Sequence, residues 1–132
     1  MELVLPYPPS VNHYWRHFKG RTLISREGRA YRQQVMTQCQ GFGGRPPRDG
    51  RLALAMDAFP PDRRRRDLDN IQKSALDSMQ HAGIYEDDSL IDLLLTRRRM
   101  PIPGGQLVVR IDDIPLRVCP LCRRALPERF SN

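Results

Sequence analysis

The sequence of 132 residues is poor in cysteine, with three in all, and it has no long apolar run. Uneven spacing of so few cysteines excludes the disulfide framework that stabilises many small secreted domains. No stretch approaches the roughly 18 apolar residues of a membrane span, and the first residues lack the pattern of a secretory signal peptide. We therefore expect a soluble, intracellular protein without a membrane partner.

Lysine is the second scarce residue. Lys19 and Lys73 are the only lysines among 22 basic side chains, and 15 acidic residues leave a net charge of +7. Such a charge is typical of proteins that bind a polyanion, most often nucleic acid, because cationic side chains gain affinity by releasing phosphate counterions. A solvated basic surface without any ligand fits the composition equally well. The position of the charges in the sequence therefore has to distinguish a nucleic-acid-binding surface from a basic surface without a ligand.

The apolar periodicity favours one α+β domain, as the length also does. We expect a small mixed sheet with two main helices packed on it over residues 1–114, followed by a short tail over residues 115–132. The segment 6–20 is rich in proline and is not expected to contain regular helix. The last two strands are expected to pair as a hairpin around the PIPGG turn. The predicted strands are 1–5, 21–24, 52–59, 90–99 and 107–111, and the predicted helices are 26–39, with Ser25 as N-cap, and 69–82.

The most informative stretch is DRRRRDLDNIQK, residues 62–73. Asp67 and Asp69 are two residues apart, so they share a face only where the chain is extended. With Asp67 in an extended segment and Asp69 near the helix N-cap, both carboxylates would meet at the helix start. Oxygen ligands in this position suit a hard cation. Lys73 follows Asp69 by four residues, so it would lie over the same turn and could contact a phosphate, a water or a leaving oxygen.

A third carboxylate can come from Glu86, Asp87 or Asp88. The helix from Asp69 rises about 20 Å, and the five extended residues after Gly83 span at most roughly 17 Å. Asp88 therefore returns near the helix start only if the chain runs directly back along the helix.

Purely structural roles also fit these residues. Asp69 could cap the helix, and Asp69, Lys73 and Asp77 could form a ladder of charges at spacings of four. These roles do not explain why four arginines are adjacent to a carboxylate pair, or why a rare lysine shares the same face. A basic loop, paired carboxylates and a lysine together favour metal-assisted phosphodiester hydrolysis, in which the metal activates water and stabilises the departing oxygen.

DRRRRDLDNIQK followed by AGIYEDD, residues 82–88, resembles the signature of the RusA family of Holliday-junction resolvases. LPYPPSVNHYWRH, GRTLISREGRAYR and the PIPGG region resemble that family in order and spacing, so that the resemblance covers about residues 3–114. It implies a RusA-like fold and a homodimeric crossover junction endodeoxyribonuclease. Such an enzyme resolves four-way DNA junctions by paired symmetric nicks during recombination and repair.

The same resemblance implies Mg²⁺ as the cofactor, with Mn²⁺ as a substitute, and no organic cofactor. It implies a cytoplasmic location, in a bacterial cell or a phage-infected host. By matching positions, Asp67, Asp69 and Asp88 are the expected metal ligands and catalytic carboxylates, and Lys73 is the expected catalytic lysine. The alternatives are a nuclease for other branched DNA and a non-catalytic DNA-binding protein with a zinc-binding tail.

Two symmetric cuts require two active sites related by a two-fold axis, which agrees with a dimer. The apolar run within residues 90–95 is one candidate for the dimer surface, although burial within one subunit explains it as well.

For Tyr14 and its neighbour Trp15, packing at the sheet edge is the more frequent role of aromatic residues, and stacking on DNA bases is the alternative. The residues expected to contact DNA are Arg63, Arg64, Arg65, Arg66, Asn70, Arg97, Arg98, Arg99, Tyr14 and Arg16.

Cys119 and Cys122 form a single CxxC motif in the tail. A zinc ribbon needs a second pair of ligands, and no Cys or His follows. Two subunits could pool their pairs, or Cys39 or a histidine could contribute, but a tail without zinc is the favoured interpretation. Nothing around the motif resembles a thioredoxin, which disfavours a redox role. The tail carries +3 of the net charge of +7, from four arginines less Glu128.

Overall fold

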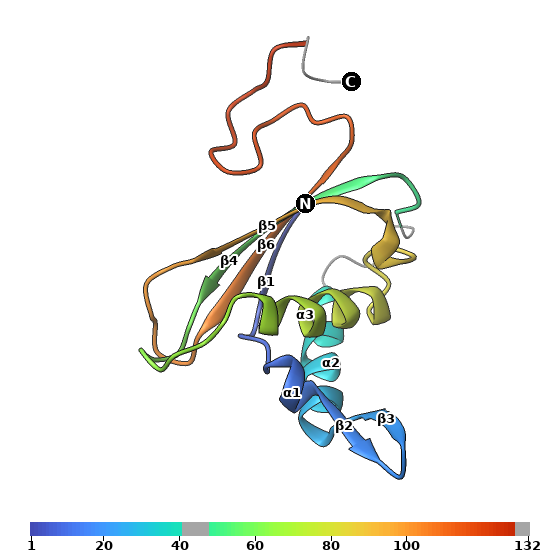
Figure 1. The fold of residues 1–132 in the computed structure, drawn as a ribbon. Coiled ribbons are helices and arrows are strands. Elements are labelled where there is room, and N and C mark those ends of the chain that lie inside the picture. Colours follow the sequence, from blue (N-terminus) through green and yellow to red (C-terminus); the bar gives the residue numbers. More distant parts are fainter. Residues whose placement is uncertain (41–47, 129–132) are drawn as a thin grey trace.

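The computed structural model describes residues 1–40 and 48–128. Its centre is a four-stranded sheet in the order β1-β6-β4-β5, and α2 and α3 pack on one face of it (Figure 1). Because β4 pairs parallel with β5 and antiparallel with β6, the sheet is mixed. The α+β prediction is confirmed. The elements are β1 (Glu2–Leu5), α1 (Val11–Tyr14), β2 (Trp15–Phe18), β3 (Arg21–Ile24), α2 (Arg26–Cys39), β4 (Leu52–Phe59), α3 (Asp69–His81), the 3-10 helix η2 (Asp88–Leu90), β5 (Ile91–Arg98) and β6 (Gln106–Asp113).

The predicted hairpin of the last two strands is wrong, because β4 lies between β5 and β6. Except for Asp57, strand β4 is apolar on both faces, and it is buried from Leu52 to Ala58, which is typical of a strand at the centre of a sheet. The link from β5 to β6 therefore crosses the end of β4. The backbone N–H of Arg99 donates to the carbonyl of Ala58 at 2.8 Å, and that of Ile102 donates to Pro60 at 2.9 Å. Strands β4 and β5 with α3 between them form a parallel crossover unit.

Two features fix α2 against the rest of the fold. The Ser25 side chain accepts a hydrogen bond from the backbone N–H of Gly28 at 2.9 Å, which confirms the predicted N-cap. A β-carbon on Gly28 would lie only 2.4 Å from the carbonyl oxygen of Tyr14, so the helix can approach α1 this closely only at a glycine. Cys39 is buried at the other end of the helix, as expected of a small apolar residue.

The segment before α2 contains more regular structure than expected. The prolines end at Pro9, and residues 11–14 then form one helical turn, with the Ser10 carbonyl accepting from His13 and Tyr14 at 2.9 Å. Strands β2 and β3 form a hairpin that projects away from the sheet (Figure 1). Its turn places Lys19 and Gly20 at positive φ, +47° and +72°. The expectation of no regular helix is therefore wrong at residues 11–14, because the prolines precede the turn.

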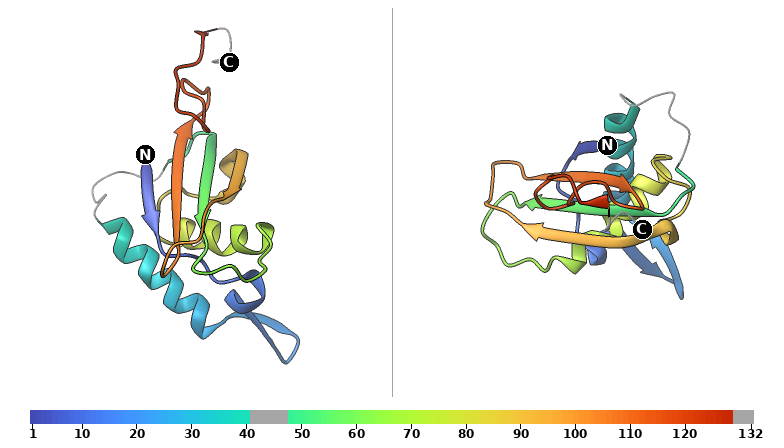
Figure 2. Two further views of the ribbon diagram at one scale, coloured as in Figure 1. Left: turned by 90° about the vertical axis from the view of Figure 1, so that its left-hand side faces the viewer. Right: turned by 90° about the horizontal axis from the view of Figure 1, so that it is seen from above.

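The tail after β6 leaves the body of the protein beyond the end of the sheet, as Figure 1 and the left view of Figure 2 show. In residues 1–40 and 48–128, no helix is long and apolar enough to cross a membrane.

Candidate active site and nucleic-acid interface

The candidate site begins where the arginine-rich loop enters α3. Asp69 is the first residue of α3, and the N-cap position is taken by Leu68, whose backbone is helical (φ −64°, ψ −37°) and whose side chain makes no cap hydrogen bond. The capping role considered for Asp69 is therefore not realised. Asp67 and Asp69 are both exposed, and neither carboxylate has a hydrogen-bond or ion-pair partner in the described part of the chain. The positive end of the helix dipole favours such charges here.

Asp88 returns along α3, as the proposed geometry requires. Gly83 at φ +78° reverses the chain, and the Tyr85 hydroxyl then donates to the Leu76 carbonyl at 2.6 Å. The backbone N–H of Asp88 donates to the Gln80 side chain at 3.1 Å. These contacts bring the Asp88 carboxylate to 3.0 Å from the Lys73 ammonium, one helical turn beyond Asp69.

The structure does not bring the three predicted carboxylates together. Among residues 1–40 and 48–128, no group of three or more His, Cys, Asp or Glu is placed to hold a metal ion. The chemistry of the donors nevertheless fits Mg²⁺, because this ion is commonly held by one or two carboxylates together with water and substrate phosphates. Asp67 and Asp69 have free oxygens, whereas the Asp88 carboxylate is occupied by Lys73. Asp67 and Asp69 are thus the residues best suited to hold the ion.

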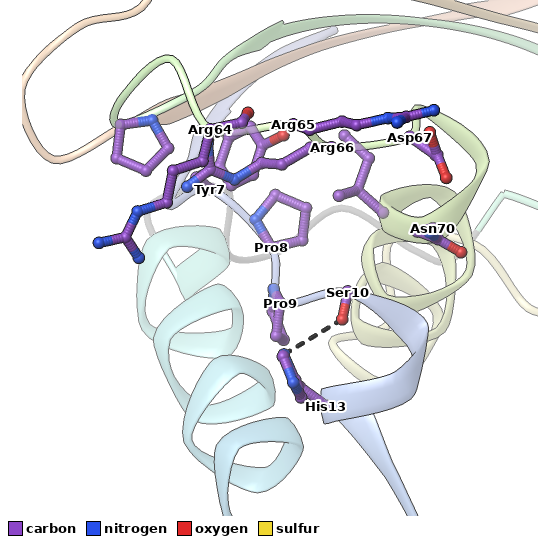
Figure 3. Close-up of a pocket in the computed structure, with 12 residues that line it drawn as sticks. Tyr7, Pro8, Pro9, Ser10, His13, Arg64, Arg65, Arg66, Asp67 and Asn70 are labelled. Carbon is purple, nitrogen blue, oxygen red and sulfur yellow. Dashed lines mark hydrogen bonds between the residues drawn. The ribbon is translucent and has the colours of Figure 1, made fainter.

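A pocket of about 570 Å³ opens beside Asp67, between the proline-rich segment and the arginine loop. In Figure 3, Asp67 and Asn70 lie on one side of it and Arg64 on the other. His13 also lies at this pocket, with its Nδ1 3.2 Å from the Ser10 hydroxyl. The lining residues are Tyr7, Pro8, Pro9, Ser10, His13, Pro61, Arg64, Arg65, Arg66, Asp67, Asn70 and Ile71.

Sequence reasoning missed Tyr7, Ser10 and His13 as residues of the site. No spacing could have placed His13 at the same pocket as Asp67, because the two are far apart in the chain. Its position depends on how the proline-rich segment docks. The Ser74 hydroxyl of α3 donates to the Pro9 carbonyl at 2.8 Å, and the Tyr31 hydroxyl of α2 donates to the Pro6 carbonyl at 2.9 Å.

The four arginines of the loop do not share one role. Arg66 donates to Asp62 at 2.6 Å, and its guanidinium lies 5.8 Å from the centre of the Tyr7 ring. The hydrogen bond from Arg66, with another from the backbone of Arg64, lowers the pKa of Asp62 to about 2. Asp62 is therefore the anion that offsets part of the like-charge repulsion in the loop. Arg63, Arg64 and Arg65 are exposed and remain available for a ligand.

A second pocket, of about 370 Å³, joins this loop to the end of β5. Arg98 and Arg99 line it together with the loop arginines, and Arg98 donates to the backbone carbonyl of Arg66. Two segments predicted separately to bind DNA thus form one basic surface.

Arg97 faces a different partner. It donates to the Asp57 carboxylate of β4 at 2.7 and 3.0 Å, and Arg110 of β6 donates to the same group at 3.0 Å. Burial raises the pKa of Asp57, but the hydrogen bonds and charges of Arg97 and Arg110 outweigh it, so the pKa lies below its usual value. Sequence reasoning missed Asp57, although a lone charge within the apolar strand LALAMDAF was a visible signal.

Tyr14 is wrong as a DNA-binding residue, because its side chain is fully buried. Its hydroxyl donates to Asp77 and accepts from Arg32 at 2.8 Å, and Arg32 pairs with Asp77 at 2.7 Å. Asp77 therefore belongs to this partly buried cluster and not to a charge ladder with Lys73. Arg16 is exposed on β2, where its guanidinium lies 5.6 Å from the centre of the Phe18 ring.

Cys119 and Cys122 lie in a turn of the tail. The backbone N–H groups of Cys122 and Leu121 donate to the Cys119 sulfur and lower its pKa. Within the described part of the chain, neither Cys39 nor a histidine joins them as a third ligand.

Comparisons with known proteins agree with this chemistry. Residues 6–112 match the family model described as "Endodeoxyribonuclease RusA". The crossover junction endodeoxyribonuclease RusA of Enterobacteria phage HK97 is 42% identical over 113 residues, which cover 86% of this chain and 94% of that protein. The protein of the same name from Enterobacteria phage 82 is 40% identical, and that from Escherichia coli K12 is 39% identical, each over 118 residues that cover 85% of this chain and 93% of the relative.

Proposed function

The chain belongs to the RusA family of endodeoxyribonucleases, and we propose that it is a crossover junction endodeoxyribonuclease that resolves four-way DNA junctions by paired symmetric nicks. The observation that carries the proposal is the pair of unpartnered carboxylates, Asp67 and Asp69, at the start of α3 beside the Lys73–Asp88 ion pair. Free carboxylates at a basic surface repel the phosphates of DNA, and a cation held between carboxylate and phosphate removes that repulsion.

Mg²⁺, or Mn²⁺ in its place, would be held by Asp67 and Asp69, with Asp88 as a further ligand once it separates from Lys73. When bound, such an ion supplies Lewis-acid stabilisation of the phosphate oxygens and a water of lowered pKa. Lys73 lies one turn from Asp69, so after leaving Asp88 its ammonium can stabilise negative charge on the departing oxygen.

The exposed arginines give the surface its affinity for the DNA backbone. Arg63, Arg64 and Arg65 extend from the loop and Arg98 from the end of β5, around the pocket that they share. Asn70, in the first turn of α3, lies at the neighbouring pocket with Asp67 and can donate to a phosphate or sugar oxygen. On the hairpin, Arg16 and Lys19 carry the same positive charge to a second point of contact.

We further propose that two copies act together, since symmetric cuts need two sites about a two-fold axis. Residues 1–114 would form the nuclease domain and residues 115–132 an appended tail, and the enzyme would serve DNA recombination and repair in the bacterial or phage-infected cytoplasm.

Strand β5 is at the edge of the sheet, and its residues Leu93, Leu94 and Leu95 are half-buried. Leu94 packs against the core, so a dimer contact on β5 would use Leu93 and Leu95, which alternate with it.

The test is cleavage of a mobile four-way junction in the presence of Mg²⁺ by the full chain and by Asp69→Asn. We expect the variant to bind the junction normally and to lose cleavage by about 10²-fold or more, because the cation loses a charged ligand. Asp49→Asn removes another exposed carboxylate, remote from α3 in the chain, and should cut normally.

Each alternative has its own outcome in this assay. Cleavage by Asp69→Asn at the normal rate would show that the metal-site assignment is wrong. Equal cleavage of three-way and four-way DNA would indicate a general branched-DNA nuclease. Binding without any Mg²⁺-dependent turnover would indicate a non-catalytic protein. Sedimentation of the free protein measures whether it is a dimer.

A further inference from the structure

The CPLC turn of the tail is the motif that the nuclease function does not use. It begins beyond residue 112, where the match to the family model ends. A bridge between Val118 and Ala125 closes it, and the backbone N–H of Cys119 donates to the Arg124 carbonyl at 2.8 Å. The N–H of Arg123 donates back to the Cys119 carbonyl at 2.9 Å. The two cysteines therefore lie on one closed turn, not on an unstructured strand.

The closure of the turn keeps the two cysteines close together. Because the Arg123 N–H donates to the Cys119 carbonyl across the CPLC residues, Cys119 and Cys122 lie within a single turn of the chain. A tetrahedral zinc ion with Zn–S distances of about 2.3 Å needs two sulfurs about 3.8 Å apart. Sulfur ligands select zinc over hard cations such as Mg²⁺.

The residue after the second cysteine is held in an uncommon conformation. Arg123 has φ +63°, in the left-handed region that side chains other than glycine, Asn and Asp seldom adopt. Its guanidinium donates to Asp112 at the end of β6 at 2.9 Å, so the strained position is also the anchor of the turn. The conformation lets the chain fold back directly after Cys122, and a structure retains such strain where it serves a site.

Charge and exposure indicate how the site is completed. A zinc ion with four thiolates carries a net charge of −2, which Arg117, Arg123 and Arg124 around the turn would offset. The described part of this chain supplies two sulfurs and no third ligand. The Cys122 side chain is exposed, and the tail projects from the end of the sheet, clear of the helices (Figure 2). A second copy can bring an identical turn to the same ion.

We propose that the CPLC turn binds Zn²⁺ through Cys119 and Cys122, and that the same two cysteines of a second copy complete a four-thiolate site. The metal then lies on the two-fold axis and joins the tails of two chains. The site is independent of the catalytic carboxylates.

The experiment is metal analysis of the full-length protein, purified under reducing conditions and dialysed against zinc-free buffer. We expect one zinc ion for every two chains. Cys122→Ser should lose the metal, whereas Cys39→Ala, which removes the remaining thiol, should keep it. Cobalt titrated into the metal-free protein should give thiolate-to-cobalt charge-transfer absorption with an intensity that corresponds to four sulfurs per ion.

Three results would overturn the proposal: a zinc content near zero, one zinc ion in every chain, or retention of zinc by Cys122→Ser. Alkylation and mass measurement of the reduced protein add a fourth, since a Cys119–Cys122 disulfide would leave no thiolates for a metal. Asp69→Asn should keep its zinc, so a failure of this site and a failure of the nuclease assignment are separate results.

Discussion

Lys73 and Asp88 form a partly exposed ion pair, with 53% and 29% of their side-chain surfaces accessible. Such a pair contributes at most about 1 kcal/mol to stability. A need for stability therefore does not explain why one of only two lysines in the chain is at this position. Its place beside the start of α3 is better explained by chemistry, in which a mobile point charge serves better than a rigid guanidinium.

Lys73→Gln should reduce cleavage of a four-way junction by about 10²- to 10³-fold, because the charge that stabilises the departing oxygen is lost. Binding should change little, since one phosphate contact at most is removed. The measurement is single-turnover cleavage beside a binding titration in Ca²⁺. Lys19→Gln removes the other lysine, which lies at the hairpin contact, so it should weaken binding but leave the single-turnover rate of the bound enzyme unchanged. A Lys73→Gln enzyme that cuts as fast as the wild type would contradict the assignment.

Asp57 is the carboxylate that neutralises the charges of Arg97 and Arg110 within the sheet. Asp57→Asn would leave Arg110, with 11% of its side chain exposed, without a full countercharge. We expect a loss on the order of 2 kcal/mol in the free energy of unfolding, less than a fully buried pair because Arg97 is 39% exposed. Asp92→Asn, in an exposed pair with Arg51, should change the stability far less, because solvent screens such a pair. Urea unfolding of the three proteins measures the difference.

The same residue predicts a pH dependence. The pKa of Asp57 is lower in the folded protein than in the unfolded chain, so its contribution is complete above about pH 4 and is lost as the pH falls through the folded pKa. Wild-type stability should decline below about pH 4, and the part due to Asp57 should be missing in Asp57→Asn.

At the scale of elements, the β2–β3 hairpin is the feature that local packing explains least. Phe18 is 53% exposed at its tip, with the Arg16 guanidinium 5.6 Å and the Lys19 ammonium 5.4 Å from the ring centre. An exposed aromatic ring with two cations beside it suits the faces of unstacked bases next to phosphates, as occurs at a DNA branch point.

Phe18→Ala should weaken binding to a four-way junction by about tenfold, since stacking on one base is worth roughly 1–3 kcal/mol. It should leave the melting temperature unchanged, because the ring is not part of the core. Binding to linear duplex, whose bases are stacked, should be affected less. Val4→Ala, another exposed apolar residue on the sheet (51% exposed), is the matched control. Equal loss on linear and branched DNA would argue against stacking.

At the scale of the whole molecule, the basic loop and the end of β5 act as one surface, so affinity should depend on salt. Replacing Arg63, Arg64 and Arg65 with glutamine should weaken binding to all DNA forms and reduce the slope of log K against log salt by up to about 3, at about 0.9 for each phosphate contact. Fluorescence anisotropy at several salt concentrations measures this slope. The exposed Arg26, Arg29 and Arg117, outside this surface and outside the hairpin, serve as the matched control triple. An unchanged slope in the loop variant would place the DNA elsewhere.

The sequence by itself determined the features that depend on neighbours in the chain. The Ser25 cap, the helix beginning at Asp69, the strand 52–59 and the motif that identifies the family follow from spacing within one element. The position of Asp88 beside Lys73 could also be predicted. Only a short segment separates the end of α3 from Asp88, and its length limits how far Asp88 can lie from the helix.

Only the tertiary structure decided how these elements meet. Burial on both faces placed β4 between β5 and β6 and overturned the hairpin, and it placed Tyr14 in the core instead of on DNA. Docking of the proline-rich segment brought His13 to the pocket that Asp67 also lines, and closure of the tail placed Cys119 and Cys122 in one turn. Each outcome depends on which apolar surfaces are buried against one another. The whole fold determines this, and the spacing of residues within one element does not.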